Sequence, residues 1–375
     1  MQILFCLDYY YPHIGGAEIL FQNLAEGLVR AGHDVQIVTQ MVSGAEKHQI
    51  HNGVEIFRVN TLGSRYLFPF AAMPVLLRLA KNADLIHTST FAAALPAWLA
   101  ARLRGKKVLL TVHEVWIGKW SDVSDAGWLS NAINSLAERM IYVPRYDGYI
   151  AVSNATARAL QGFAKSPVEV IYNAVDYEHW NPARYDGAAV RRGLGLEGGF
   201  LFLFNGRPGR SKGLPVLLRA FAKIGAGNAR LLVLASRSKA CQTGYDEAVQ
   251  LVAELGLQDK VIFKASVPYG ELPGIVAAAD CVCVPSLSEG FGFCAAEACA
   301  MGVPVIATDN ASLPEVVCGK YLLVPPGDST AFAEAMKRAM ENDYQHSEPK
   351  YFTQEANLNA HIALYKAANC RSRLL

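Results

Sequence analysis

The chain has 375 residues, of which 52% are hydrophobic and 18% charged, so it is long and apolar enough to fill two domain cores. This composition excludes a disordered chain, and a formal net charge of +2 argues against a nucleic-acid-binding protein. Residues 1–7 enter a strand pattern without a basic leader, and no apolar run reaches the about 18 residues of a membrane span. The eight cysteines form no C-x2-C pair, which favours small buried residues over a zinc site. We therefore expect a cytoplasmic protein without a bound metal.

Strand and helix patterns alternate through the first half of the chain. Short apolar runs predict buried strands, and helical spacing of apolar residues predicts the helices between them. Helices are expected before Gly32 and at about 70–82 and 91–104. The expected strands are 3–7, 33–39, 54–59, 85–87, 107–112, 147–152 and 168–172. This alternation is typical of a doubly wound parallel sheet.

Two places in the first half carry residues suited to ligand binding. Gly15 and Gly16 separate the first strand from the first helix, where a glycine pair allows either a tight turn or a close backbone approach to phosphate. The pair does not form G-x-G-x-x-G, so dinucleotide binding is weakly supported. His113 ends the strand 107–112, and a lone histidine at a strand end is more often structural than catalytic.

Basic residues are concentrated between residues 58 and 107, where Asp84 is the single acid. The eight basic residues are Arg58, Arg65, Arg78, Lys81, Arg102, Arg104, Lys106 and Lys107. Aromatic residues are interleaved, namely Tyr66, Phe68 and Phe70, and farther on Trp116, Trp120 and Trp128. This combination suits an anionic membrane surface or a lipid-phosphate acceptor, although a solvated face with scattered core aromatics explains it equally well.

A second α/β unit begins after residues 177–199, which are rich in glycine, proline and polar residues and are expected to form a linker. Strands are predicted at 200–204, 230–235, 261–264, 281–285, 303–307 and 321–324. The first of them leads into a basic loop, 205–213, that holds Arg207, Arg210 and Lys212. Such a loop suits an anionic phosphate, although alone it is equally well a solvated turn.

The stretch 284–309 reads as strand, loop, helix and strand. Its loop contains Glu289 and two glycines, Gly290 and Gly292, and the helix that follows contains Glu297. Loops at the carboxyl ends of parallel strands are the usual ligand sites of such sheets, and a helix N-terminus favours an anion. We therefore expect a binding site here with two carboxylates eight residues apart.

This stretch resembles the Glu-x7-Glu motif of the family-4 retaining glycosyltransferases. Three further motifs are similar to that family, namely Pro-His-x-Gly-Gly-x-Glu at residues 12–18, Thr-x-His at 111–113 and Asn-x-Val-Asp at 173–176. The loop with Gly206-Arg207 and Lys212-Gly213 also resembles the family's donor-phosphate loop, and the five motifs occur in the family's order. Ala174 and Glu114 depart from the commoner Gly and Asp. The resemblance implies the GT-B fold, an α/β architecture of two Rossmann-like domains with doubly wound parallel sheets facing a central cleft. The implied domains are 1–176 on the acceptor side, with a helix at about 352–375 packing back on it, and 200–351 on the donor side.

The resemblance also implies a role for each candidate residue. Arg207 and Lys212 would stabilise the departing diphosphate, Glu289 and His113 would contact the donor sugar, and Glu297 would bind the ribose. The backbone near Val267 would contact the base. The remaining donor contacts are implied for Gly15, Gly16, Gly290, Phe291 and Gly292.

The implied reaction transfers a hexosyl unit from a nucleotide sugar, GDP-mannose or a UDP-hexose, to a hydroxyl of a glycan or lipid-linked acceptor. The anomeric configuration would be retained by front-face attack, without a metal or other cofactor, since no D-x-D motif stands where a metal-dependent transferase would use one. The alternatives are a GT-B epimerase or phosphorylase, or a non-catalytic nucleotide-sugar-binding protein. Nucleic acid is not expected as a partner, and a peripheral position on the inner face of the cell membrane fits the basic stretch.

Overall fold

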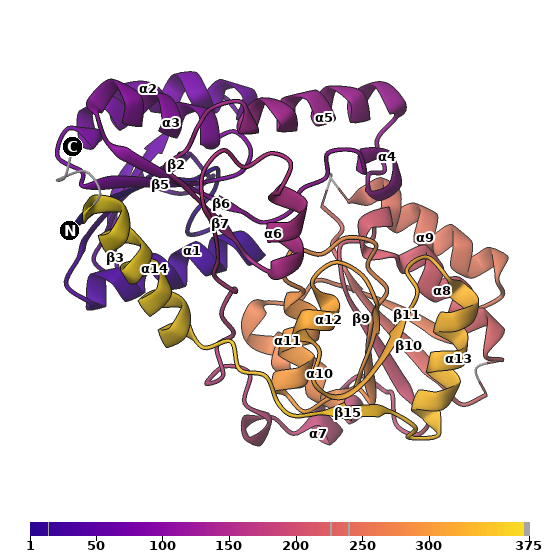
Figure 1. Cartoon of the computed structure of the whole chain (residues 1–375). Coiled ribbons are helices and arrows are strands. Elements are labelled where there is room, and N and C mark those ends of the chain that lie inside the picture. The colour runs from indigo at the N-terminus through magenta and orange to yellow at the C-terminus, as the bar shows by residue number, and fades with distance from the viewer. Residues whose placement is uncertain (14, 226, 239–240, 371–375) are drawn as a thin grey trace. The chain divides into compact units, whose positions relative to one another are not determined.

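A computed structural model describes residues 1–13, 15–225, 227–238 and 241–370 of the chain (Figure 1). The chain divides into two compact units. The first comprises Met1–Ile117, Ile133–Ala174 and Phe352–Leu375, and the second comprises Gly118–Ala132 and Val175–Tyr351. Each unit contains its own sheet, with helices on both faces.

The sheet of the first unit has the strand order β3-β4-β2-β1-β5-β6-β7-β8. All neighbours are parallel except β3, which pairs antiparallel with β4 at the edge. The strands are β1 (Gln2–Cys6), β2 (Asp34–Gln40), β3 (His48–His51), β4 (Val54–Val59), β5 (Leu85–Ser89), β6 (Lys107–Val112), β7 (Gly148–Ala151) and β8 (Val168–Val170). The central strands are buried on both faces, which explains their continuous apolar sequence.

Two helical layers cover this sheet. Helices α2 (Phe68–Ala80), α3 (Ala94–Arg104) and α5 (Trp128–Tyr142) contribute to one core, and α1 (Gly16–Arg30) and α14 (Gln354–Cys370) to the other. Helix α3 packs closely because its buried side chains are mostly alanines, and it ends at Gly105 in the left-handed conformation. Helix α6 (Asn154–Leu160) begins at Ser153, whose hydroxyl accepts from the backbone N–H of Thr156.

The sheet of the second unit has the order β11-β10-β9-β12-β13-β14-β15, again parallel except for the last strand. Its strands are β9 (Leu201–Gly206), β10 (Arg230–Ala235), β11 (Val261–Ala265), β12 (Cys281–Val284), β13 (Val305–Thr308), β14 (Gly319–Val324) and β15 (Gln345–Ser347). Its helices are α4 (Trp120–Val123), α7 (Gly187–Gly193), α8 (Leu214–Lys223), α9 (Gln242–Glu254), α10 (Leu272–Ala278), α11 (Phe293–Ala300), α12 (Leu313–Val316) and α13 (Ser329–Met340). The prediction of two doubly wound parallel-sheet domains is thus confirmed, and the antiparallel edge strands β3 and β15 were not predicted.

Each sheet has a point at which the chain reverses its direction of winding. In the first unit this point lies between β1 and β5, and in the second between β9 and β12. The loops that leave the carboxyl ends of such neighbouring strands turn to opposite faces of the sheet, which leaves a ligand-binding crevice. In the second unit these are the loops that carry Lys212 and Glu289.

The linker predicted at 177–199 is not an irregular segment. It forms a 3-10 helix at Pro182–Arg184 and helix α7, and it counts with the second unit. Trp180 is buried and donates its indole N–H to the Tyr269 hydroxyl at 3.1 Å. A Cβ at Gly187 would overlap the carbonyl oxygen of Ala277, so glycine allows α7 to lie against α10. These contacts join residues that are far apart in sequence, so the composition of residues 177–199 alone could not predict them.

One member of the predicted basic face is also placed differently. Arg58 is buried in β4, where its guanidinium donates to the backbone oxygens of Tyr11 and Glu46 at 2.7 and 2.9 Å. Among the described residues, no helix is both long and apolar enough to span a bilayer.

Candidate active site

The loop after β9 and the loop after β12 are joined through their backbones. Leu287 and Ser288 donate their N–H groups to the carbonyl oxygen of Ser211 at 2.8 and 3.3 Å. Gly213 has a φ of +68°, and a Cβ there would overlap the carbonyl oxygen of Pro285. Glycine at this position therefore permits the close approach that aligns the two loops.

A charged cluster spans these two loops. The Lys212 Nζ lies 2.6 Å from Oε1 of Glu289, and the Ser286 hydroxyl donates to the same oxygen at 2.9 Å. The Ser312 hydroxyl donates to the backbone oxygen of Glu289 at 3.1 Å, which fixes the loop around the carboxylate. Lys212 and Glu289, 77 positions apart in sequence, are thus held in one part-buried cluster. The sequence analysis assigned both residues to a donor site.

Arg207 leaves β9 beside this cluster and is exposed. Within the described ranges, its guanidinium has no recorded hydrogen bond or ion pair. The cation is therefore accessible to an anionic ligand. Arg210, which was not assigned to the site from the sequence, is exposed as well, and its backbone N–H donates to the Asp125 carboxylate at 3.0 Å.

Gly292 is the N-cap residue of helix α11, and its φ of +92° favours glycine. A Cβ there would lie 2.8 Å from Cδ2 of Leu313, so the turn is also tightly packed. The Phe291 side chain is buried and meets the Phe293 ring edge-on at 5.1 Å. Because the Phe291 side chain is buried, only its backbone is available to a ligand.

Glu297 lies in the second turn of α11 and is buried. Burial raises the pKa of its carboxyl group to about 8, so the group is mostly protonated at neutral pH in the unliganded protein. The Cys294 thiol, one turn earlier, has its pKa raised to about 12, first by burial and then by the Glu297 and Glu289 carboxylates. Both glutamates thus act electrostatically on one point, at the start of α11.

Val267 is not part of this cluster. It follows β11, the edge strand of the sheet, and two strands separate β11 from β12. Val267 is partly exposed.

The first-unit candidates lie at the carboxyl edge of their own sheet. Gly15 caps α1 with extended backbone, and Gly16 is the first residue of the helix. A Cβ at Gly15 would overlap the Glu18 carboxylate, which lies 3.5 Å from Nδ1 of His13. The glycine thus lets Glu18 fold back over the helix N-terminus.

His113 directly follows β6, and its ring meets the Phe21 ring edge-on at 5.9 Å. Its Nε2 is buried, and within the described part of the chain no hydrogen-bond partner is recorded for it. Burial lowers the pKa of His113 to about 4, so the imidazole is neutral at pH 7. A neutral ring nitrogen without a protein partner is suited to a hydroxyl group of a ligand.

Comparison with known proteins extends these observations over most of the chain. Residues 14–179 match the family described as Glycosyltransferase Family 4, and residues 189–358 match Glycosyl transferases group 1. Together the two matches indicate a GT-B glycosyltransferase.

The glycosyltransferase also resembles individual proteins. It is 28% identical over 331 residues to an uncharacterized glycosyltransferase of Methanocaldococcus jannaschii, covering 82% of this chain and 80% of that one. It is 26% identical over 321 residues to D-inositol 3-phosphate glycosyltransferase of Mycobacterium tuberculosis, covering 81% of this chain and 66% of that one. Among solved structures, Anabaena HepE in complex with UDP-glucose superposes with a TM-score of 0.75 at 21% identity, covering 99% and 98% of the two chains, which supports the fold.

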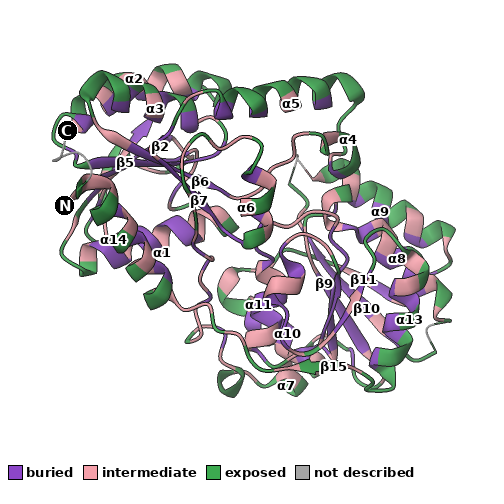
Figure 2. Ribbon diagram, viewed as in Figure 1, coloured by how far each residue is buried: buried purple, intermediate pink, exposed green. Residues whose placement is uncertain are grey.

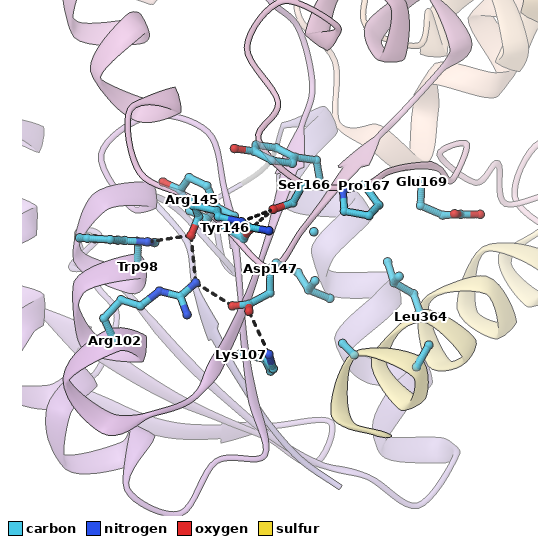
Figure 3. A pocket seen from close by; sticks show the side chains of 15 residues that line it. Trp98, Arg102, Lys107, Arg145, Tyr146, Asp147, Ser166, Pro167, Glu169 and Leu364 are labelled. Atoms are coloured by element: carbon cyan, nitrogen blue, oxygen red, sulfur yellow. Dashed lines mark hydrogen bonds and ion pairs between the residues drawn. The ribbon is translucent and has the colours of Figure 1, made fainter. Parts of the chain in front are cut away.

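A pocket of about 660 Å³ lies in the first unit of the glycosyltransferase, where strands β6, β7 and β8 begin (Figure 3). This is the edge of the sheet opposite to the carboxyl ends of the strands, where the candidate residues of this unit lie. Arg102 and Lys107 both bond to Asp147, at 2.8 and 3.2 Å. None of the predicted site residues lines this pocket.

The sequence analysis missed two groups near the candidate residues. Asp8 follows β1, its Oδ2 accepts from the N–H of Ala92 at 3.3 Å, and burial raises the pKa of this carboxyl to about 6. Cys294 was read only as a small buried residue. Cys294 and Glu297 are three residues apart on one helix, so the sequence could have predicted that they lie close together. It could not have predicted that the Glu289 carboxylate also lies near the Cys294 thiol.

Proposed function

We propose that this glycosyltransferase is a retaining hexosyltransferase that uses a nucleotide sugar and a hydroxyl acceptor. The observation that carries this proposal is the Lys212–Glu289–Ser286 cluster beside the exposed Arg207, at the point where the second sheet changes its winding direction. The cluster combines cations for a diphosphate with a carboxylate for sugar hydroxyls. These are the two kinds of group that a nucleotide sugar requires.

Arg207 and Lys212 would stabilise the departing nucleoside diphosphate. Cleavage of the glycosidic bond concentrates negative charge on the leaving phosphate, and preorganised cations lower the barrier to that step. Arginine can bind a phosphate through two parallel hydrogen bonds, and lysine adds a compact charge. Lys212 is part-buried and already held by Glu289, which prepositions its ammonium group.

Glu289 and Glu297 would bind hydroxyl groups of the donor. Glu289 shares one oxygen with Lys212 and Ser286, and its second oxygen is suited to the hexose. Glu297 is suited to the ribose, because a vicinal diol can supply two hydrogen bonds to a buried carboxylate. The backbone of Gly290, Phe291 and Gly292 would face the sugar or phosphate, and that of Val267 the base.

In the first unit, Gly15 and Gly16 would allow close approach of the donor phosphate or the acceptor. His113 would contact the donor sugar as a neutral imidazole. This assignment is supported by its buried and unpartnered Nε2 among the described residues.

The reaction would proceed by attack of the acceptor on the same face from which the diphosphate departs. The leaving phosphate would take the acceptor proton, and the anomeric configuration would be retained. No metal or other cofactor takes part in this proposal, because Arg207 and Lys212 supply the positive charge. Chelation of divalent metal by EDTA should therefore leave the initial rate unchanged.

GDP-mannose and the UDP-hexoses are the proposed donors, and the UDP-glucose complex of the structurally similar HepE supports the second group. The proposed acceptor is a glycan or a lipid-linked molecule. The name of one relative, D-inositol 3-phosphate glycosyltransferase, supports a hydroxyl acceptor that bears a negative charge.

The test is incubation of each donor with a mixture of glycan and lipid-linked acceptors, followed by measurement of nucleotide release and of the product by NMR. We expect acceptor-dependent release and a product with the donor's anomeric configuration. An inverted product would contradict retention. Conversion of the donor to another sugar nucleotide without acceptor would instead identify an epimerase.

A further inference from the structure

Exposed large apolar side chains are concentrated in one part of the chain. Of the eighteen such side chains among the described residues, fourteen lie between residues 62 and 143. The other four are Ile50, Val249, Met340 and Tyr351. This distribution is far from the scattered pattern of an ordinary surface and marks a region for interaction.

Helix α5 shows the clearest departure, because several of its apolar side chains are exposed while two of its polar side chains are buried. Leu136, Ile133 and Met140 are 62%, 58% and 48% exposed, whereas Asn131 and Glu138 are buried. The buried Glu138 accepts a hydrogen bond from the backbone N–H of Trp116 at 2.8 Å. The Asn131 side chain donates to the backbone oxygen of Ala126 at 3.0 Å. The helix thus exposes a group of apolar side chains while it buries two polar ones, and exposed apolar side chains on a helix are also a feature of helices on a lipid surface.

The neighbouring helix α3 adds a second row of apolar side chains. Leu95, Leu99 and Leu103 follow one another at intervals of four residues and are all exposed. The side chain of Arg102 and the indole N–H of Trp98 both donate to the backbone oxygen of Arg145, at 2.9 and 3.0 Å (Figure 3). These bonds hold the segment after α5 against α3, so the two rows belong to one outer surface.

We call this surface the α3–α5 face and define it by Leu95, Leu99, Leu103, Ile133, Leu136, Met140 and Val143. Figure 2 shows the outward sides of α2, α3 and α5 as exposed. All seven side chains are exposed, and none of them lines the pocket shown in Figure 3. A broad apolar layer fits such a surface better than a single peptide segment does.

Positive charge surrounds the α3–α5 face. In residues 65–117 and 133–147 there are nine basic residues and four acids, Asp84, Glu114, Glu138 and Asp147, of which Glu138 is buried and Asp147 pairs with Arg102 and Lys107. Arg104 and Arg139 are exposed, and within the described residues no acidic partner is recorded for them. Exposed cations around an apolar face complement anionic headgroups around an acyl layer.

Exposed aromatic side chains also lie in or beside α2 and α5. Tyr66 and Phe70 are exposed before and within α2, and Trp128 at the start of α5 is 81% exposed. Aromatic residues with these exposures are typical of the interface between headgroups and acyl chains.

We propose that the α3–α5 face is a docking surface for an anionic lipid bilayer. The face inserts its leucine, isoleucine and methionine side chains among the acyl chains, and Arg104 and Arg139 contact anionic headgroups. This contact is independent of the donor chemistry proposed above, and it would place the enzyme beside a lipid-linked acceptor.

The test is co-sedimentation of the full chain with vesicles of phosphatidylcholine, with and without phosphatidylglycerol at about a third of the lipid, at two salt concentrations. We expect the wild type to bind phosphatidylglycerol vesicles at least about tenfold more strongly than pure phosphatidylcholine and to lose affinity as salt rises. L136E/M140E should lower binding at least tenfold, about 1.4 kcal/mol, and R104E/R139E should abolish the preference for anionic lipid. V249E, which alters an exposed helical residue of the second unit, should bind as the wild type does.

Two results would overturn the proposal. One is wild-type binding that is absent at low salt or unchanged in a folded L136E/M140E variant. The other is a concentration-dependent dimer that L136E/M140E disrupts, which would identify a second copy of the chain as the occupant.

A second measurement uses the unaltered α3–α5 face, so its result does not depend on whether the glutamate variants fold. Brominated lipids should quench the emission of Trp128, taken as the difference between wild type and W128F. The absence of such quenching in a vesicle-bound wild type would also contradict the proposal. Nucleotide binding, measured separately, distinguishes a failure of this proposal from a failure of the proposed function.

Discussion

At the scale of single residues, the Lys212–Glu289 ion pair is the central feature of the candidate site. Its members come from different loops and are 2.6 Å apart. The spacing in sequence alone did not predict this ion pair, although the sequence did assign both residues to the donor site. The structure adds that each side chain helps to position the other before a ligand binds.

Replacing Lys212 by alanine should lower kcat at least about a hundredfold, because preorganised charge stabilisation of a leaving group typically contributes this much. Glu289→Ala should have a comparable effect through loss of sugar positioning. Initial rates with saturating donor provide the measurement. Arg210→Ala is the matched control in the same loop and should remain near wild type; near-normal turnover in folded Lys212→Ala would remove Lys212 from the site.

Glu297 should make the stability of the unliganded protein depend on pH. Its pKa is raised in the folded state from an ordinary 4.5 to about 8, so the folded protein binds more protons than the unfolded chain between these values. The free energy of unfolding should therefore fall as pH rises from about 5 to 8, by up to about 1.4 kcal/mol per unit. Glu297→Gln should flatten this decline in urea titrations, and an unchanged slope would show that the carboxyl is ionised when the protein is unliganded.

At the scale of elements, the parallel strands were predictable because each is a short apolar run buried on both faces. Four elements could not be predicted, namely the helices α4 and α7 and the edge strands β3 and β15. They are short or polar, and contacts with residues distant in sequence fix their conformation. Helix α5 was missed for a different reason. Its exposed side chains include Ile133, Leu136 and Met140, and its buried ones include Asn131 and Glu138 beside Ile141 and Tyr142, so the apolar spacing of an amphipathic helix is weak there.

The approach of the two donor-site loops depends on glycine at one position. Gly213→Ala should destabilise the protein by more than about 2 kcal/mol, because the new Cβ would overlap the Pro285 carbonyl as well as strain a positive φ. Gly256→Ala is the matched control, because Gly256 has a φ of +67° and a Cβ there would meet no atom within 4 Å. It should cost only about 1 kcal/mol in urea unfolding. Equal losses would show that the loops can separate without cost.

At the scale of the whole molecule, the chain forms two sheets of eight and seven strands, and each sheet has a winding reversal beside which the candidate site residues lie. The sequence indicated this architecture through its alternation of strands and helices, and the resemblance supplied the order of the motifs. The sequence did not predict that three side chains lie near the start of α11, namely Glu289, Glu297 and Lys212, because their proximity depends on the register of β9 with β12. The burial of Arg58 likewise depends on contacts across the sheet.

The central claim is that the second unit binds a nucleotide sugar through this cluster, and thermal unfolding with UDP, GDP, ADP and their sugar conjugates tests it most directly. A ligand that binds only the folded state adds about 2.7 kcal/mol of stability at about one hundred times its dissociation constant. We predict that one nucleotide and its conjugates raise the Tm of wild type and do so much less in Arg207→Ala and Glu297→Ala. No rise in Tm with any of them, in a well-folded sample, would contradict this claim.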